Sequence, residues 1–502
     1  MTRKIYLRKF DGGHAEDVRG DSTDECEFSK NFDIFTNPHK LIPYGDSVAE
    51  TVSGSTMDDI EIDNVDVSLI GSSYIMTGAG YESGSSAKPA FFTKADIVTT
   101  FSSQAVAAGN TYVKNSLVVF REKAYALGWN GSNQITLYRY NSGGSVTAAG
   151  TVAVTEVPIA KPFVHPEDNV LYIVCGNVIA TFTIIGGTDT MTTYSTILPT
   201  GFQATSQCDY GNYLAIAMRP LRGNGNSVTY LWGRDGTINT LQGTIDFGEG
   251  SINLLENLDN NLFAVMTPQT TLFTNITNKI TVKGYAGGAV ETIKSITNGS
   301  TATATIYKQK NGGKVYFGFA NDDAIYAFGK NKSGKYIITK DRYLFNGTTI
   351  GSSFSGVSMI GDVMWRAFTT LAGVFTLMRS KVAQLGESIT YTSTSTYRTL
   401  VNPSMPLEDR YTDKLLKGVR IAYTGATTGT TVLKYSVNGG AFTTIISDTN
   451  AAGEQCTEAN TESDGVPLGQ GREFQFQVET TGGAQVKEID YYYDNLPSTN
   501  GL

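Results

Sequence analysis

Pairs of hydrophobic strands return along this chain at a regular interval. Each copy has an apolar run, a polar turn and a second apolar run, and the first runs of six copies begin at residues 124, 170, 213, 262, 315 and 363. The differences between successive starts are 46, 43, 49, 53 and 48 residues. Four-stranded blades of a β-propeller repeat at about 40–50 residues, so this interval predicts a propeller.

An earlier copy, DVSLIGSSYIMTGAG at 66–80 followed by KPAFFTKAD at 88–96, brings the predicted number of four-stranded blades to about seven. Within the copies, strands such as LYIVC at 171–175 and LFAVM at 262–266 are continuous apolar runs. Continuous runs indicate strands that are buried on both faces. Blades that stack side by side around an axis bury their inner strands in this way.

The pattern changes near residue 400. The segment 402–418 contains two prolines and most of the local charge, which is typical of a linker. Beyond it, Phe474, Phe476 and Val478 alternate with polar residues. This alternation predicts a strand with one buried face and one solvent-exposed face. With Asn-Gly-Gly at 438–440 as a turn, this alternation predicts a small antiparallel β-sandwich.

The sequence therefore predicts an all-β chain of three parts. These are an N-terminal strand and extended arm at 1–60, a β-propeller at 61–400 and a C-terminal β-sandwich at 401–502. We expect the propeller ring to close by pairing of an N-terminal strand with a strand near 389–400, because closure removes exposed sheet edges.

Charge and composition narrow the class of protein. Charged residues make up 17% of the chain, below the average of about 25%. A low surface charge suits a subunit that buries much of its outside against neighbouring copies, and it also suits a robust extracellular protein. The net charge of −8 argues against a sequence-specific or general nucleic-acid binder, which needs a basic surface to neutralise phosphates. A channel through which DNA merely passes remains compatible with this charge.

Cysteine usage and the N-terminus indicate the compartment. Cys26, Cys175, Cys208 and Cys456 have no paired spacing, and Cys175 lies in an apolar run where a buried free thiol is expected. This usage suits folding in a reducing cytoplasm. The N-terminal residues MTRKIYLRKFDGG lack the apolar core of a signal peptide, and no window approaches about 18 apolar residues. We therefore expect no membrane-spanning segment.

No catalytic, cofactor-binding or metal-binding residues can be nominated from the sequence. The three histidines are too few and too dispersed for a metal centre or a general base. No nucleophile elbow, phosphate-binding loop or dinucleotide fingerprint occurs. Carboxylates gather at two places but lack the ligand order of an EF-hand, so solvated acidic loops are expected; they are Asp58, Asp59, Glu61, Asp63 and Asp66, and Asp322 with Asp323.

Two other local features have a functional and a structural reading. Arg234-Asp235-Gly236-Thr237 resembles part of the Asp-box of sialidase-like propellers, but a tight turn whose Asp caps its own backbone is the simpler state. Aromatic side chains that could stack on sugars are Trp129, Trp232 and Tyr491–Tyr493. Aromatic residues of strands more often pack against cross-strand neighbours.

The segment 10–44, FDGGHAEDVRGDSTDECEFSKNFDIFTNPHKLIPY, resembles the opening arm of a group of tailed-bacteriophage structural proteins. In that group an F-x-G-G start leads into S-x-N-F-D-I-x-x-x-P-x-K-L-x-P. The second element here consists of Ser29, Asn31, Phe32, Asp33, Ile34, Pro38, Lys40, Leu41 and Pro43. The segment 230–265, YLWGRDGTINTLQGTIDFGEGSINLLENLDNNLFAV, is similar to blade sequences of such proteins.

The resemblance implies a non-enzymatic structural subunit of a phage tail, of the nozzle, hub or ring type around the DNA-ejection channel. It implies a six-fold ring-like homo-oligomer held by large inter-subunit contacts, located in the virion tail and made in the cytoplasm of the host bacterium. Adaptor, portal-proximal or fibre proteins would be its further partners. The alternative is a glycan-binding or glycan-cleaving propeller acting as a receptor-binding tail protein or adhesin, which would have convergent carboxylates and exposed Trp or Tyr in a pocket.

Overall fold

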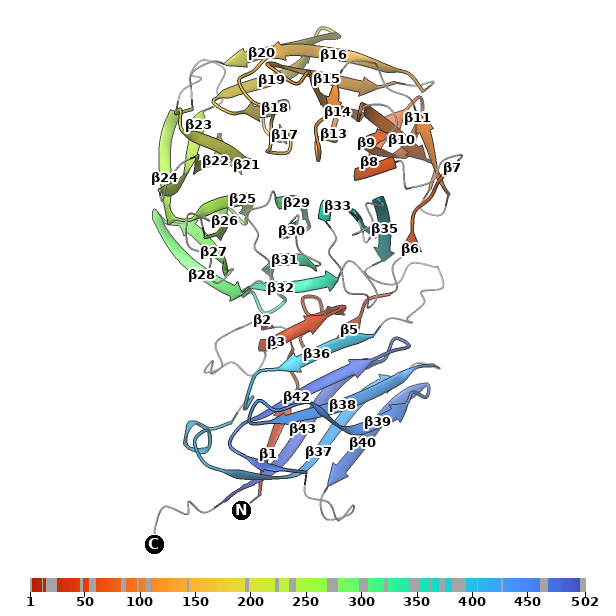
Figure 1. Cartoon of the computed structure of the whole chain (residues 1–502), viewed down its shortest axis with the longest axis vertical. Helices are drawn as coiled ribbons and strands as arrows, with labels where there is room; N and C mark the ends of the chain where they lie inside the picture. Colours follow the sequence, from red (N-terminus) through yellow and green to blue (C-terminus); the bar gives the residue numbers. More distant parts are fainter. Residues whose placement is uncertain are drawn as a thin grey trace. The chain divides into compact units, whose positions relative to one another are not determined.

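The computed structural model consists of β-strands, with one short 3-10 helix at Leu407–Asp409 among the described residues (Figure 1). The chain divides into two compact units, Val48–Asp323 with Thr349–Arg379, and Met1–Ser47 with Ala324–Thr348 and Ser380–Leu502. The structure describes residues 2–10, 12–14, 25–45, 48–53, 60–82, 87–96, 99–104, 110–141, 144–194, 198–221, 225–233, 241–268, 279–297, 306–319, 324–343, 353–361, 363–369, 375–381, 394–403, 405–425, 428–460 and 468–496.

Seven sheets have the strand order of propeller blades, and Figure 1 shows them around a common centre, which confirms the predicted fold class. Blades one to three contain β8 (Ile60–Ile70), β9 (Ser73–Glu82), β10 (Pro89–Lys94) and β11 (Phe101–Gln104); β12 (Thr111–Tyr112), β13 (Val118–Phe120), β14 (Lys123–Trp129), β15 (Gln134–Tyr140) and β16 (Val146–Ala153); and β17 (Phe163–His165), β18 (Val170–Cys175), β19 (Val178–Ile185) and β20 (Thr188–Tyr194).

The remaining four blades follow the same order. They contain β21 (Phe202–Tyr210), β22 (Tyr213–Pro220), β23 (Asn226–Gly233) and β24 (Leu241–Glu249); β25 (Ser251–Leu258), β26 (Asn261–Thr267), β27 (Lys279–Ala286) and β28 (Ala289–Thr297); β29 (Ile306–Asn311), β30 (Lys314–Phe319), β31 (Ala324–Lys330) and β32 (Tyr336–Tyr343); and β33 (Ser353–Ile360), β34 (Val363–Thr369) and β35 (Phe375–Lys381).

In the six regularly spaced copies the recurring sequence unit starts at the second strand of the blade, whereas the earlier copy at 66–80 lies on β8 and β9, the first two strands of blade one. The apolar runs that begin at Ala124, Val170 and Tyr213 form β14, β18 and β22, each of which is preceded by an inner strand. The second strand is the most apolar one because it lies between two strands of its own sheet and is covered by the neighbouring blades on both faces. The period was therefore predicted well, whereas the start of each blade was not.

Strand β18 shows why continuous apolar runs form these blades. Its odd-numbered residues Leu171, Ile173 and Cys175 pack in a cluster with side chains of blade two. Its even-numbered residues Tyr172 and Val174 pack in a separate cluster with side chains of blade four. Since successive side chains of a strand point to opposite faces, both faces are buried, as the continuous run predicts.

The ring closes through a short segment that precedes the first blade. Strand β6 (Val48–Ala49) pairs antiparallel with β35 as the outermost strand of the seventh blade. Strand β7 (Val52–Ser53) pairs parallel with β11 of the first blade. Residues 48–53 therefore join the last blade to the first, and closure occurs at Met378 and Arg379 instead of near 389–400.

A buried cluster of ion pairs stabilises the junction between the seventh blade and the first. The Glu50 carboxylate lies between β6 and β7, 2.7 Å from the Nζ of Lys94 on β10 and 2.8 Å from the Nε of Arg379 on β35. The indole N–H of Trp365 on β34 donates to the same carboxylate at 3.3 Å. The side chains of Glu50 and Lys94 are 4% and 0% exposed, so their charges interact with little screening by water.

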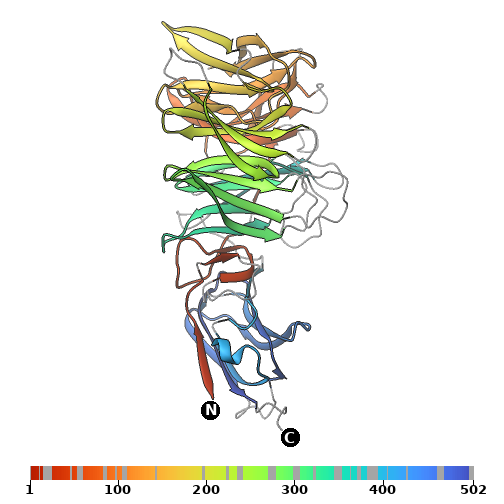
Figure 2. The ribbon, with the colours of Figure 1, turned by 90° about the vertical axis from the view of Figure 1, so that its left-hand side faces the viewer.

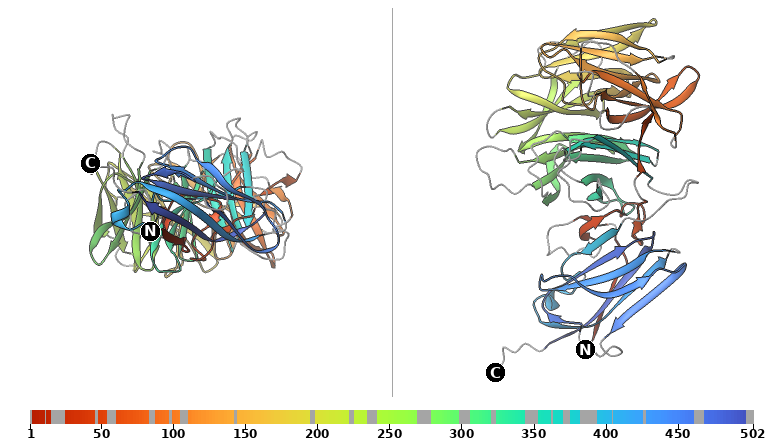
Figure 3. Two further views of the ribbon diagram at one scale, coloured as in Figure 1. Left: turned by 90° about the horizontal axis from the view of Figure 1, so that it is seen from below. Right: turned by 45° about the vertical axis from the view of Figure 1, so that its right-hand side comes forward.

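The second unit contains a β-sandwich whose two sheets enclose one apolar core (Figure 3). One sheet has the order β1-β43-β37-β40, with β41 also paired to β37, and the other has the order β2-β3-β36-β42-β38-β39. The strands are β1 (Arg3–Leu7), β2 (Gly13–His14), β3 (Glu25–Lys30), β36 (Ser395–Thr399), β37 (Lys414–Gly425), β38 (Thr430–Val437), β39 (Thr443–Thr449), β40 (Gly453–Asn460), β41 (Gln470–Gly471), β42 (Phe474–Thr480) and β43 (Gln485–Asn495).

The predicted N-terminal arm is part of this sandwich. Strands β4 (Phe32–Asp33) and β5 (Ile42–Pro43) pair with each other, and Phe32, Ile34 and Leu41 lie in the sandwich core. The Asp33 carboxylate accepts the backbone N–H of Phe35 at 2.9 Å, which turns the chain after β4. The observed division thus differs from the expected 1–60, 61–400 and 401–502, because residues at both ends of the chain build one sandwich and the propeller lies between them in sequence.

Glu50→Gln should destabilise the propeller by about 3–5 kcal/mol, because it leaves the cations of Lys94 and Arg379 buried without a carboxylate. The control Glu249→Gln changes an exposed side chain of β24 and should stay within about 0.5 kcal/mol of the parent. Urea unfolding followed by tryptophan fluorescence measures this, since all three tryptophans belong to the propeller unit: Trp129, Trp232 and Trp365. Equal midpoints for the two variants would contradict the proposed role of Glu50.

Candidate functional site at the propeller axis

The inner strands of four blades share a β-bulge at the corresponding position. In β8, β21, β25 and β33 the register shifts by one residue, which leaves an extra residue opposite the second strand. All four extra residues are polar and buried, and they are Asp63, Thr205, Asn253 and Ser355. A bulge bends its strand and redirects one side chain, so the bulges place polar groups where the inner strands come together.

Two of these bulges connect neighbouring blades. The Thr205 hydroxyl donates to the backbone carbonyl of Ile252 in the next blade at 2.6 Å. The Asp63 carboxylate accepts hydrogen bonds from the Tyr112 hydroxyl and the Asn115 backbone N–H of blade two, both at 2.6 Å. Polar groups at the bulges are therefore used for blade-to-blade contacts.

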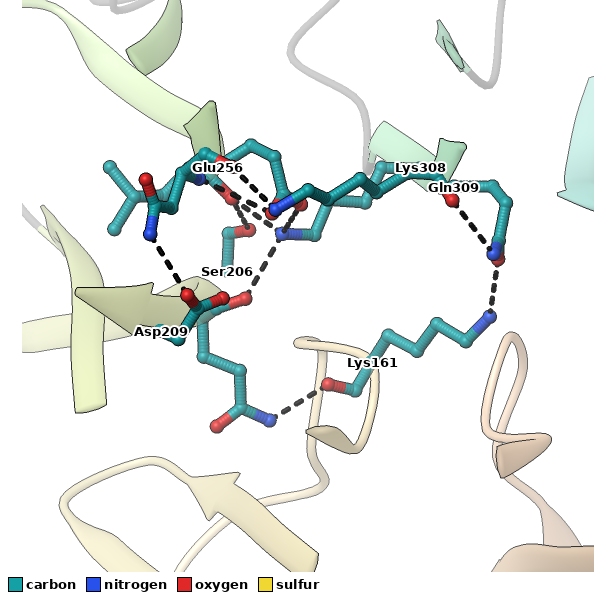
Figure 4. Close-up of polar contacts among 10 residues, drawn as sticks. Lys161, Ser206, Asp209, Glu256, Lys308 and Gln309 are labelled. Carbon is teal, nitrogen blue, oxygen red and sulfur yellow. Dashed lines mark hydrogen bonds and ion pairs between the residues drawn. The ribbon is translucent and has the colours of Figure 1, made fainter. Parts of the chain in front are cut away.

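Two lysines from blade six pair with one glutamate from blade five, and Figure 4 shows Lys308 and Glu256 of this group. The Lys308 Nζ lies 2.9 Å from a carboxylate oxygen of Glu256 and donates to the backbone carbonyls of Gln207, at 3.0 Å, and Leu255. The Nζ of Lys310 lies 3.7 Å from the other carboxylate oxygen of Glu256. Blades four, five and six are thus joined through one lysine.

Lys161, which precedes β17 of blade three, reaches across the centre. Its Nζ donates to the Asn64 Oδ1 of blade one at 3.3 Å and to the Gln309 Oε1 of blade six at 3.2 Å (Figure 4 shows the second contact). Its backbone carbonyl accepts the Gln207 side-chain amide of blade four at 2.7 Å. One residue therefore contacts blades one, four and six, and its side chain occupies the axis.

The electrostatics of the axis follow from burial. Burial lowers the pKa of Lys161, and the carboxylates of Asp66 and Asp63 act against this shift. Burial, together with the nearby charge of Glu61, raises the pKa of Asp63 to about 7. Glu61 in turn lies 3.0 Å from the Nζ of Lys114. Glu256 and Glu61 are paired with lysines, the Asp63 carboxylate accepts hydrogen bonds, and the Lys161 ammonium donates to amide oxygens, an arrangement that suits a rigid polar core.

Three residues of the acidic cluster that was predicted as a solvated loop belong to a strand. Glu61, Asp63 and Asp66 belong to β8 and face protein partners, because this strand is the inner strand of the first blade. Among the described residues no group of three or more His, Cys, Asp or Glu side chains could hold a metal ion. Other candidates lie outside the described residues: Asp58, Asp59, Asp322, Asp323 and Arg234–Thr237.

The aromatic candidates are packed inside the protein. Trp232 is 1% exposed and stands edge-on to Tyr172, with Tyr194 on its other side, while Trp129 packs against the cluster between blades two and three. Tyr491 and Tyr493 are buried in the sandwich, whereas Tyr492 lies on the opposite face of β43. Cys175 is a buried free thiol, as predicted.

Sequence reasoning missed the axial residues Lys161, Glu256 and Lys308. A signal was present, because charged residues interrupt the first strands of blades, as in SINLLENL at 251–258 and IYKQKN at 306–311. The strands that contain these charged residues precede the recurring apolar pair. They can be recognised as the inner strands of the blades only when the blade is known to begin one strand before that pair.

No protein-family model and no curated protein sequence matches this chain. Solved structures with a similar fold include the Dos1 propeller (12% identity, 69% of this chain and 96% of that chain, TM-score 0.42). They also include a putative 6-phosphogluconolactonase from Bacteroides uniformis (14%, 63% and 97%, TM-score 0.41) and an exo-beta-1,3-galactanase from Phanerochaete chrysosporium (11%, 90% and 100%, TM-score 0.30). At these identities the likeness concerns the fold alone.

The described part of the chain contains no helix with the length and apolar character that a bilayer crossing requires.

Asp63→Asn should change how propeller stability depends on pH. The folded-state pKa of Asp63, about 7, exceeds its ordinary value of 3.8, so its contribution to stability is full below about pH 4 and is lost as the pH rises to about 7. An asparagine does not titrate, so the variant should gain stability relative to the parent across this window. Urea midpoints from tryptophan fluorescence at pH 4.5, 6 and 7.5 measure the difference, and a constant difference would contradict the assignment.

Proposed function

We propose that this chain is a non-enzymatic structural subunit of a bacteriophage tail, a nozzle, hub or ring component around the DNA-ejection channel. In this role it assembles as a ring-like homo-oligomer, with six-fold symmetry as the working expectation. Adaptor, portal-proximal or fibre proteins are its neighbours in the virion tail, and it is made in the cytoplasm of the host bacterium.

The observation that carries the proposal is the segment Ser29–Pro43, whose sequence resembles the opening arm of tailed-phage structural proteins. Its apolar positions Phe32, Ile34 and Leu41 are core residues of the sandwich, and Asp33 forms the turn between them. The resemblance therefore involves the residues on which the fold of this unit depends.

The ion pairs of the carboxylates near the propeller axis support a structural role. Glycoside hydrolysis needs two carboxyl groups free to act on a sugar from opposite sides. Glu256 is instead paired with Lys308 and Lys310, and Glu61 with Lys114. Because Lys161 crosses the centre of the propeller, a DNA channel in such an assembly would lie between subunits and not through a propeller. The net charge of −8 would keep DNA from adhering to the walls of that channel.

Two measurements test the proposal. Mass photometry of the purified chain should detect a closed oligomer, and antibodies against the chain should label the tails of phage particles released by cells that carry its gene. A panel of polysaccharides incubated with the chain should yield no reducing sugar. A persistent monomer with unlabelled particles would refute the structural role, and release of reducing sugar would favour the glycan-cleaving alternative.

A further inference from the structure

The outer face of one sandwich sheet carries charges that alternate in sign from strand to strand. In the sheet order β1-β43-β37-β40, the register places Tyr6, Asp490, Arg420 and Glu458 in one row across the four strands. Side chains of paired residues in antiparallel strands point to the same face. The basic residues of this face are Lys4 on β1, Arg8 directly after it and Arg420 on β37, and the acidic residues are Glu488 and Asp490 on β43 and Glu454 and Glu458 on β40. Lys487 on β43 is an exception to the alternation and forms an ion pair with Glu454.

Contacts within the sheet follow this alternation. Arg420 lies 3.2 Å from Glu488 and 3.4 Å from Asp490, so the acidic strand β43 is neutralised from the β37 side. From the β1 side, the Nζ of Lys4 lies 3.7 Å from Asp490, and Arg8 forms an ion pair with Glu488. Each internal strand of the sheet thus has neighbours of opposite charge on both sides.

The two border strands, β1 and β40, have an oppositely charged neighbouring strand on one side only. Among the described residues, β1 pairs only with β43 and β40 pairs only with β37, and Figure 2 shows β1 along the border of its sheet. The β1 border is basic and the β40 border, with Glu454 and Glu458, is acidic. Border strands expose unpaired backbone N–H and C=O groups that can pair with another chain.

We propose that the β1 border of one copy pairs with the β40 border of the next copy, so that the sheet continues from subunit to subunit. Every neighbouring pair in this sheet is antiparallel, so β1 and β40 run in opposite directions. A β40 strand placed next to β1 therefore continues both the antiparallel order and the alternation of charge. The proposal rests on the proposed function, because it takes a ring of copies as the assembly.

The charges of the two borders favour a head-to-tail arrangement of copies over a two-fold dimer. In a two-fold dimer, β1 would face β1 or β40 would face β40, which places like charges opposite each other and is destabilising. Pairing of β1 with β40 places opposite charges together and is head-to-tail. Head-to-tail contacts generate a closed ring when the rotation between copies closes.

Charge reversal on the β40 border tests the contact. Glu454→Lys with Glu458→Lys changes two exposed side chains and should raise the Kd of assembly at least about tenfold, because the border would then repel β1. The control Glu249→Lys with Glu291→Lys makes the same charge change on the outer blade strands β24 and β28 and should assemble as the parent does. Mass photometry measures both, with circular dichroism to verify folding. Loss of assembly in the control alone would overturn the proposal in favour of contacts between propellers.

Crosslinking tests the geometry independently of charge. Cys456 is an exposed thiol on β40, the other cysteines described are buried, and Tyr6 on β1 is 47% exposed. Within one copy these two positions lie three strands apart, about 14 Å. A Tyr6→Cys variant treated with a bismaleimide shorter than this should give a ladder of covalent oligomers, and the ladder should vanish when Cys456→Ser is added.

The outcomes separate this proposal from the proposed function. Covalent dimers that persist with Cys456→Ser would indicate a two-fold contact and overturn the head-to-tail pairing. An assembled chain that neither crosslinks nor responds to reversal on β40 would overturn the pairing and leave the ring intact. A chain that never assembles would overturn both.

Discussion

The buried carboxylate of Glu50 is the contact on which closure of the propeller depends. The strands that join the last blade to the first, β6 and β7, contain two residues each, so their backbone hydrogen bonds alone provide little stability. Glu50 lies between them and bonds to cations of the first and the seventh blade, Lys94 and Arg379. In a region that excludes water, such a contact is strong only when all its members are present. The ring is therefore closed by a side-chain cluster as much as by a sheet.

Closure brings seven inner strands to one axis, and the polar axis follows from that crowding. Bulged residues such as Asp63 and Thr205 bond to the next blade, and Lys308 joins three blades through Glu256 and two carbonyls. Buried charges without partners are costly, so Lys308 and Glu256 neutralise each other and Lys161 donates to side chains of blades one and six. The described polar groups at the axis thus join the blades to one another.

The sandwich is built from strands at both ends of the chain. Arg3 pairs with Tyr493 and Leu7 with Ile489, so the first and last strands are neighbours in one sheet. The alternating charges of this sheet hold β1 in place and also give its two borders opposite signs. The proposed pairing with a second copy would use the same charges that stabilise the sheet.

The repeat interval and the continuous apolar runs determined the propeller and its approximate number of blades, since a strand such as β18 must be buried on both faces wherever it lies. Alternation at Phe474, Phe476 and Val478 likewise determined a sandwich strand, because a two-residue period is a local property of the chain. The start of each blade, the closing contact of Glu50 with Arg379 and the place of Phe32 in the sandwich core were decided by the tertiary structure. These features depend on residues that are distant in sequence, and a local pattern of apolar and polar positions carries no information about which distant strand becomes the neighbour.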